Sequence, residues 1–181
     1  MAYIDSGNNR MGIVELLLYK PVTGKIISEF TNALLQGPSP LSVAQREMIA
    51  TFVSHLNGCE FCYKMHKAVM ESADAEEGEI LECAIYQVES EKVTPKLKAL
   101  LKLAKLIQSN ELHAMEKEIS NAHAAGASDE EIHDTVLISS AFCMFNRYVD
   151  GLGANLPKDE GAYSSLGAFV AKQGYKSSLS K

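Results

Sequence analysis

Apolar residues recur at intervals of three and four along most of the chain, and no segment sustains the two-residue alternation of a half-buried strand. The pattern therefore predicts helices, separated by breaks at glycine, proline and asparagine. The expected helices cover residues 24–35, 42–56, 59–72, 76–88, 94–107, 111–125 and 128–149, with a short one at 166–171. We expect an all-α fold.

Local signals mark several helix ends. Ser42–Gln45 and Ser128–Glu131 have the capping-box pattern, in which a hydroxyl and a side chain three residues later each bond the other's backbone. Thr94-Pro95 joins a capping hydroxyl to a proline at the first helical position. Asn57-Gly58 should end a helix, because both residues tolerate the left-handed conformation found there.

Size and composition exclude several classes of protein. The 181 residues suit one domain, and 46% hydrophobic residues are too many for a chain disordered over most of its length. The sequence has no run of about 20 apolar residues, the length that a membrane-spanning helix needs. The polar start MAYIDSGNNR lacks a secretory pattern, so we expect a cytoplasmic protein. The net charge of -6 opposes nucleic-acid binding.

Candidate chemistry is concentrated between Glu47 and His66. Cys59 and Cys62 stand three residues apart at a helix start, where backbone amides and the helix dipole stabilise a thiolate. His66 lies one turn beyond Cys62 on the same face and can accept the thiol proton. Glu47 is on the preceding helix, from which it can fold back to orient His66. These features together describe a dithiol redox centre, in which the second thiol resolves an oxidised sulfur as a disulfide.

Spacing alone leaves two other interpretations open. A Cys-x-x-Cys pair also occurs in zinc sites, where Cys59, Cys62 and His66 would need Glu47 as a fourth ligand. The cysteines could also be inert structural residues. We expect no metal and no cofactor, because the other two cysteines are isolated within apolar helical stretches and form no second pair.

The frame Glu47-x(11)-Cys59-x-x-Cys62-x-x-x-His66 is similar to the core of the AhpD-like, or carboxymuconolactone decarboxylase-like, superfamily. Flanking residues agree with its peroxidase-related (alkylhydroperoxidase-like) subgroup: Asn57-Gly58-Cys59, Phe61-Cys62, Pro38-Ser39-Pro40-Leu41 upstream, and Phe145-Asn146-Arg147 with Asp150-Gly151-Leu152-Gly153 downstream. The resemblance covers a helical domain at 11–156. It leaves 157–181 as a C-terminal tail, expected to be loose or to pack on a neighbouring subunit.

The resemblance implies a helical bundle that assembles as a homotrimer or a hexamer. It also implies an alkylhydroperoxidase-like thiol peroxidase or disulfide oxidoreductase, supplied with electrons by a thiol donor. Cys62 would attack the hydroperoxide or disulfide substrate, Cys59 would resolve the product, and His66 and Glu47 would form the proton relay. The family relay has a further histidine just before the second cysteine, where this chain has Phe61, so the relay is shorter or turnover weaker.

The decarboxylase branch of the superfamily lacks the cysteine pair, so the dithiol argues against lactone decarboxylation. An enzyme that uses His66 and Glu47 as acid and base on a lactone remains the alternative, beside the metal-binding structural module.

Overall fold

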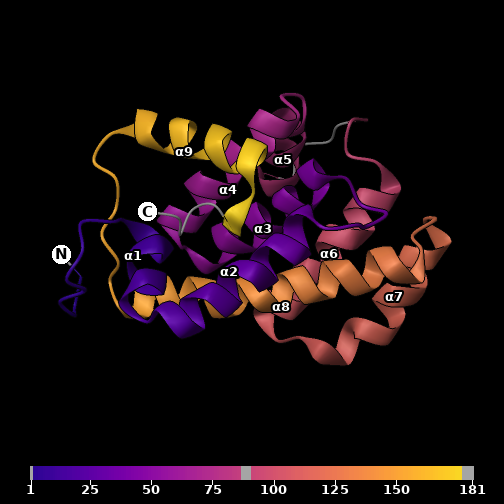
Figure 1. Cartoon of the computed structure of the whole chain (residues 1–181). Helices are drawn as coiled ribbons and strands as arrows, with labels where there is room; N and C mark the ends of the chain where they lie inside the picture. Colours follow the sequence, from indigo (N-terminus) through magenta and orange to yellow (C-terminus); the bar gives the residue numbers. More distant parts are fainter. Residues whose placement is uncertain (1, 87–90, 177–181) are drawn as a thin grey trace.

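The computed structural model describes residues 2–86 and 91–176, and these form an all-α fold (Figure 1). The helices are α1 (Gly12–Tyr19), α2 (Pro21–Gln36), α3 (Val43–Asn57), α4 (Glu60–Ala73), α5 (Glu77–Tyr86), α6 (Pro95–Ser109), α7 (Met115–Ala124), α8 (Asp129–Gly151) and α9 (Glu160–Gln173), with a 3-10 turn at Leu112–Ala114. Within the described residues, no helix is both long enough and apolar enough to span a bilayer.

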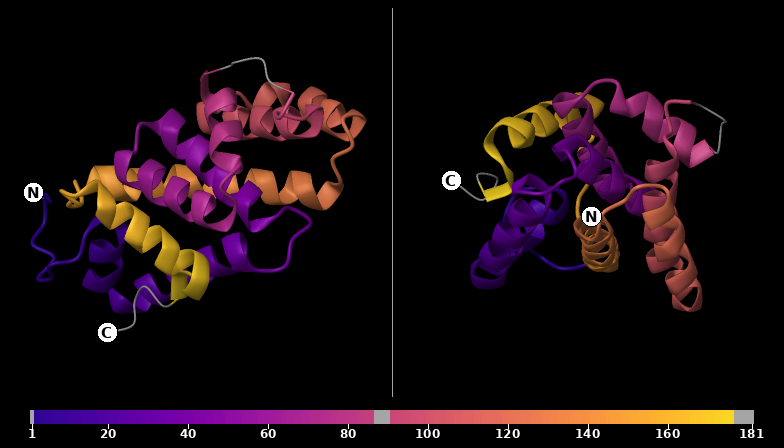
Figure 2. Two further views of the ribbon diagram at one scale, coloured as in Figure 1. Left: turned by 90° about the horizontal axis from the view of Figure 1, so that it is seen from above. Right: turned by 90° about the vertical axis from the view of Figure 1, so that its right-hand side faces the viewer.

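The long helix α8 forms the axis of the bundle. Seen nearly end-on in Figure 2, it lies below α3 and α4, with α1 and α2 on one side and α6 and α7 on the other. Its side chains Ile138 and Phe142 are completely buried, as are Met48, Ile49 and Val53 of α3. The core therefore lies between α3 and α8, and α4 also packs on α3.

The predicted helix ends are confirmed where local chemistry determines them. Both capping boxes are present: Ser42 caps α3 with Gln45, and Ser128 caps α8 with Glu131. The Thr94 hydroxyl accepts from the amide of Leu97 at the start of α6. Gly58 ends α3 with φ of 73°.

Other boundaries differ from the predictions. Helix α1 was not predicted, and α2 begins at Pro21 rather than at residue 24. The helix expected at 76–88 covers 77–86, and residues 87–88 lie outside the described part of the chain. The stretch expected as one helix at 111–125 divides into the 3-10 turn and α7.

The expectation that the C-terminal tail is loose or packs on another subunit is wrong for residues 160–173. They form α9, which packs on α4 of the same chain. At Gly167 the two helices approach so closely that an added Cβ would lie 2.6 Å from the Cβ of Ala68. The boundary between a domain at 11–156 and a separate tail stays a prediction.

Candidate active site

A tight turn between α3 and α4 places the two cysteines. Gly58 takes the left-handed conformation that ends α3, and the amide of Cys59 then donates to the carbonyl of Ser54 at 3.0 Å. Cys59 becomes the N-cap residue of α4, and Cys62 lies in its first turn. Both thiols therefore lie at the positive end of the helix dipole, which favours a thiolate.

Cys59 and Cys62 are reduced and buried, and their sulfurs interact with each other. The hydrogen bond with Cys62 and the burial of the thiol raise the pKa of Cys59 well above its ordinary value. The Asp150 carboxylate, which also bonds this thiol, acts in the same direction. Cys59 thus keeps its proton in the folded, reduced protein.

Three buried groups, one of them His66, form a hydrogen-bonded cluster. The Nδ1 atom of His66 lies 2.8 Å from Oε2 of Glu47 and 2.9 Å from the hydroxyl of Tyr175. That hydroxyl donates to Glu47, with its oxygen 2.8 Å from Oε1 and 3.0 Å from Oε2. Glu47 comes from α3, His66 from α4, and Tyr175 from the segment after α9.

Further contacts make a charged Glu47 tolerable in the core. The amide of Gln36 donates to its Oε1 atom at 3.3 Å. The neighbouring Arg46 is also buried and donates to the carbonyls of Leu34 and Gly37 at 3.2 and 2.8 Å. Burial lowers the pKa of Arg46, and the charges of Asp134 and Glu47 oppose that shift. A positive charge and several donors thus compensate the buried carboxylate.

This arrangement assigns a tautomer to His66. If Nδ1 carries the proton and donates it to Glu47, the other ring nitrogen, Nε2, is left unprotonated and can act as a base. The ring is fixed by an edge-to-face contact with Phe142 at 4.6 Å between centroids. His66 is therefore held in place, one turn from Cys62, with the carboxylate partner that a general base requires.

A small cavity of about 50 Å³ adjoins Cys62 and His66. It is large enough for a few water-sized groups. Its walls are otherwise mainly apolar: Ile13, Val14, Leu17, Ser28, Thr31, Phe61, Met65, Phe145, Leu166, Val170 and Tyr175. Cys59 and Glu47 are not among the lining residues, so a molecule in the cavity would meet Cys62 first.

Comparison with known proteins places this site in a family. Residues 21–90, which include all four predicted site residues, match the sequence model of the carboxymuconolactone decarboxylase family. Over this segment the chain is therefore similar to the carboxymuconolactone decarboxylase family. No curated protein matches the chain.

Solved structures with the same fold are peroxidase-related, AhpD-like proteins. An uncharacterised peroxidase-related protein from Silicibacter sp. TM1040 superposes with a TM-score of 0.71 and 25% identity, over 84% of this chain and 78% of that one. An alkylhydroperoxidase AhpD core protein from Ralstonia eutropha JMP134, also uncharacterised and peroxidase-related, has the same TM-score and coverage at 19% identity, which shows the fold alone. A protein of unknown function from Agrobacterium tumefaciens, proposed as an antioxidant defence protein AhpD, has a TM-score of 0.64 and 25% identity, over 77% and 94% of the two chains.

The structure brings together the four residues predicted within the family segment. Cys59 contacts Cys62, and Glu47 contacts His66, as the sequence predicted. Their catalytic roles stay predictions. Phe61, where the resemblance led us to expect a relay histidine, lies in the cavity wall.

Sequence analysis missed Tyr175, which lies outside the resemblance. No motif distinguishes it, and its contacts arise only when α9 folds back over α4. The preceding Gly174, with φ of 74°, was the available signal that the chain turns there.

The zinc alternative lacks a suitable ligand set. Glu47 is bonded to His66 and Tyr175, and among residues 2–86 and 91–176 no three His, Cys, Asp or Glu side chains are grouped so that they could hold a metal ion.

Proposed function

We propose that the protein is an AhpD-like thiol peroxidase or disulfide oxidoreductase that acts through Cys62 and Cys59. The observation that carries the proposal is the cavity that Cys62 and His66 line together, with Cys59 in contact with Cys62. A small hydroperoxide fits the volume, and the mainly apolar walls favour an organic substituent.

The chemistry follows from these positions. His66 takes the thiol proton of Cys62 at Nε2, and the thiolate attacks the outer oxygen of the hydroperoxide. The O–O bond breaks, Cys62 becomes a sulfenic acid, and His66 returns its proton to the leaving alkoxide, which departs as an alcohol. Cys59 then attacks the sulfenic sulfur, giving a disulfide and water. Two thiol equivalents from an external donor reduce that disulfide.

The test is a thiol titration with mass spectrometry before and after one equivalent of tert-butyl hydroperoxide. The reduced protein should lose two thiols and two mass units. Cys62→Ser should abolish peroxide consumption, whereas Cys59→Ser should consume one equivalent and stop as a sulfenic acid. Cys83→Ser, on α5, is the matched control and should behave like the wild type. Normal turnover by Cys62→Ser would refute the proposal.

The Glu47–His66 pair also supports acid–base chemistry on a lactone, the second candidate. That activity would survive replacement of both Cys59 and Cys62, which separates the two candidates.

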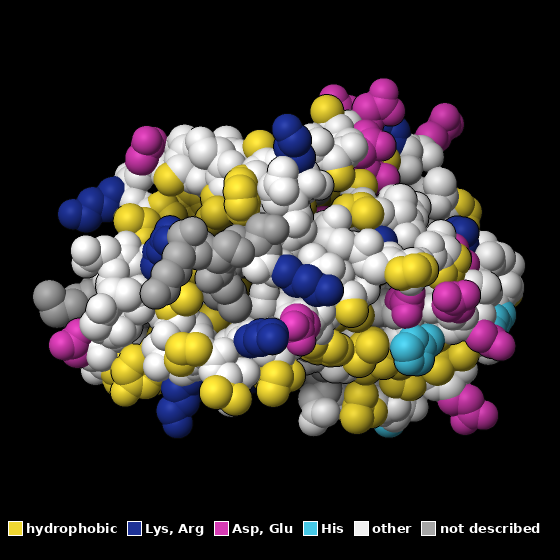
Figure 3. All heavy atoms as spheres, viewed as in Figure 1, with side chains coloured by type: hydrophobic (Ala, Val, Ile, Leu, Met, Phe, Trp, Pro, Cys, Tyr) yellow, Lys and Arg dark blue, Asp and Glu magenta, His cyan; other side chains and the backbone are white. Residues whose placement is uncertain are grey.

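Assembly as a homotrimer or a hexamer is also part of the proposal. It is supported by an apolar stripe on α2 made of Val22, Ile26 and Phe30, whose side chains are one helical turn apart and exposed. Figure 3 shows hydrophobic side chains along the lower edge of the molecule, over α1 and α2.

A further inference from the structure

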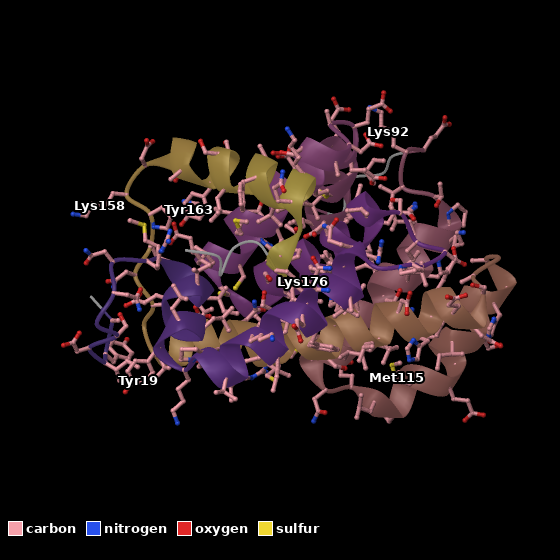
Figure 4. The ribbon with its side chains drawn as sticks, in the orientation of Figure 1. Tyr19, Lys92, Met115, Lys158, Tyr163 and Lys176 are labelled. Atoms are coloured by element: carbon pink, nitrogen blue, oxygen red, sulfur yellow. The ribbon has the colours of Figure 1, made fainter. Side chains whose placement is uncertain are left out.

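The end of the described chain is built into the site. After α9, Gly174 turns the backbone with φ of 74°, and residues 175–176 descend from α9 towards α2 and α3, where Figure 4 labels Lys176. The amide of Tyr175 donates to Oδ1 of Asn32 at 3.0 Å, and its carbonyl accepts from the Ser28 hydroxyl at 2.9 Å. Ser28 and Asn32 lie one turn apart on α2, so two side chains fix the backbone of Tyr175.

The phenol of Tyr175 is directed at the relay. Its ring stacks on His66 at 5.7 Å between centroids with an interplanar angle of 26°. Burial, the charge of Glu47 and the hydrogen bond to it raise the pKa of Tyr175 well above its ordinary value. The hydroxyl consequently keeps its proton and remains a donor to Glu47.

The hydrogen-bond geometry restricts where protons can reside. While the Tyr175 hydroxyl donates to the carboxylate, Glu47 is stabilised in its charged form, in which it can accept the Nδ1 proton of His66. If Glu47 became protonated, it would donate to Nδ1 instead, and the proton of His66 would move to Nε2. His66 would then lose the unprotonated Nε2 atom that acts as the base in the proposed reaction.

We propose that Tyr175 is a positioning residue of the peroxidase, whose hydroxyl keeps Glu47 charged and His66 in the Nδ1–H tautomer and so sets the lower pH limit of Cys62 activation. The inference rests on the proposed function. The proton transferred in the reaction moves between Cys62 and Nε2 of His66, whereas the Tyr175 proton stays on its oxygen.

Several groups face this network from the elements packed around it. The charged and titratable ones are Arg46 on α3, Cys62 on α4 and Tyr175 itself. Helix α2 contributes the neutral Gln36, and α8 the apolar Phe142. Tyr175→Phe removes one donor and leaves the others in place.

The experiment compares Tyr175→Phe with Tyr163→Phe across pH 5 to 9. Tyr163 is a matched control because it is a buried tyrosine on α9 and its hydroxyl has no hydrogen-bond partner among the described residues. The first readout is the single-turnover rate of disulfide formation with tert-butyl hydroperoxide. The second is the rate at which iodoacetamide alkylates Cys62, followed by mass spectrometry, which reports thiolate formation without any peroxide chemistry.

For Tyr175→Phe we expect the midpoint of the acidic limb to rise by about one to two pH units in both readouts, the shift that the loss of one hydrogen bond to a charged group produces. Rates at pH 9 should stay within about threefold of the wild type. The pH profiles of Tyr163→Phe should superimpose on those of the wild type. If Tyr175→Phe left the midpoint unchanged, or lowered the rate by the same factor at every pH, the inference would be overturned.

A measurement on the wild type needs no variant. The ¹⁵N shifts of the His66 ring at pH 7.5 should show a proton on Nδ1, and a proton on Nε2 alone would contradict the inference. Normal peroxide turnover by Cys62→Ser would refute the proposed function, but the iodoacetamide alkylation profile of Tyr175→Phe could still shift as expected. Failure of the proposed function is therefore distinguishable from failure of this inference.

Discussion

At the scale of single residues, Glu47 carries a charge at a position with no exposure to solvent. Its partners are His66, Tyr175 and Gln36, so removing the charge changes the relay without emptying the space. We expect Glu47→Gln to slow peroxide-dependent disulfide formation about 10²- to 10⁴-fold, the usual contribution of an acid–base group.

Glu15→Gln is the control for that substitution. Glu15 is equally inaccessible but bonds Ser6 and Asn155, away from the cysteines. This variant should lose stability and keep the wild-type rate per folded molecule. Equal rates for Glu47→Gln and Glu15→Gln would exclude Glu47 from the relay.

The raised pKa of Cys59 predicts a pH dependence of stability for the reduced protein. The hydrogen bond with Cys62, together with burial, keeps Cys59 protonated in the folded state, whereas in the unfolded chain a cysteine ionises near pH ~8.5. Stability from this group is complete below that pH and declines above it, by up to about 1.4 kcal/mol per pH unit.

Urea unfolding under reducing conditions between pH 7.5 and 10 measures this decline in stability. Cys59→Ser should flatten the alkaline decline, and Cys83→Ser should keep it. A decline of the same steepness in Cys59→Ser would show that the pair is not coupled in the folded protein.

The sequence predicted the site residues whose contacts depend on near neighbours. Cys62 and His66 are one helical turn apart, and Glu47 is joined to them by a single tight turn, so spacing alone brings the three close. Tyr175 meets Glu47 across 128 residues of chain, and that contact depends on how α9 docks. Local spacing carries no information about such docking.

At the scale of elements, local capping chemistry explains why the starts of some helices were predicted correctly. Helices α3, α6 and α8 begin at capping residues that act on their own first turn. Helix α1 has only eight residues and no capping side chain, and its buried Leu16 and Leu17 are stabilised by packing against other helices. Helix α9 also has a cap, in which Asp159 accepts from the amide of Gly161, but the sequence analysis predicted only a short helix at 166–171.

The contact between α9 and α4 should control access to the cavity beside Cys62. Leu166 and Val170 of α9 form part of its wall, and Gly167 between them lies against Ala68. The Cβ of Gly167→Ala would lie 2.7 Å from the backbone carbon of Ala68, so the helices must separate. We expect a loss of about 1–3 kcal/mol in the free energy of unfolding.

The same displacement should expose Cys62, so that a bulky disulfide reagent labels it at least about tenfold faster, an increase equivalent to about 1.4 kcal/mol. Gly151→Ala, where nothing lies within 4 Å of the added Cβ, is the matched control and should leave stability and labelling within error. Unchanged labelling of Gly167→Ala would show that α9 does not govern access to the cavity.

At the scale of the whole molecule, the apolar stripe on α2 is large for a surface that faces water. Val22 and Ile26 are 79% and 62% exposed, and Phe30 is 37% exposed one turn further on. Exposed apolar residues that are aligned on one helix face, rather than scattered, indicate an interface between protein chains. In this protein the interface would be with further copies of the same chain, as the proposed trimer or hexamer requires.

Ile26→Glu tests that assembly, because it places a charge at the centre of the stripe without touching the core. We expect the wild type to scatter light as a trimer or a hexamer at micromolar concentration, and Ile26→Glu to shift towards the 19.7 kDa monomer with its helical circular dichroism unchanged. The control is Lys25→Glu, at an exposed neighbouring position off the stripe, which should keep the wild-type mass. A wild-type chain that is monomeric at this concentration would contradict the assembly. A fully oligomeric Ile26→Glu would show that the interface does not involve the stripe on α2.

Ser28 and Asn32, which hold the backbone of Tyr175, lie on the same helix as the stripe. If assembly stabilises α2, dissociation should therefore also lower the rate of disulfide formation.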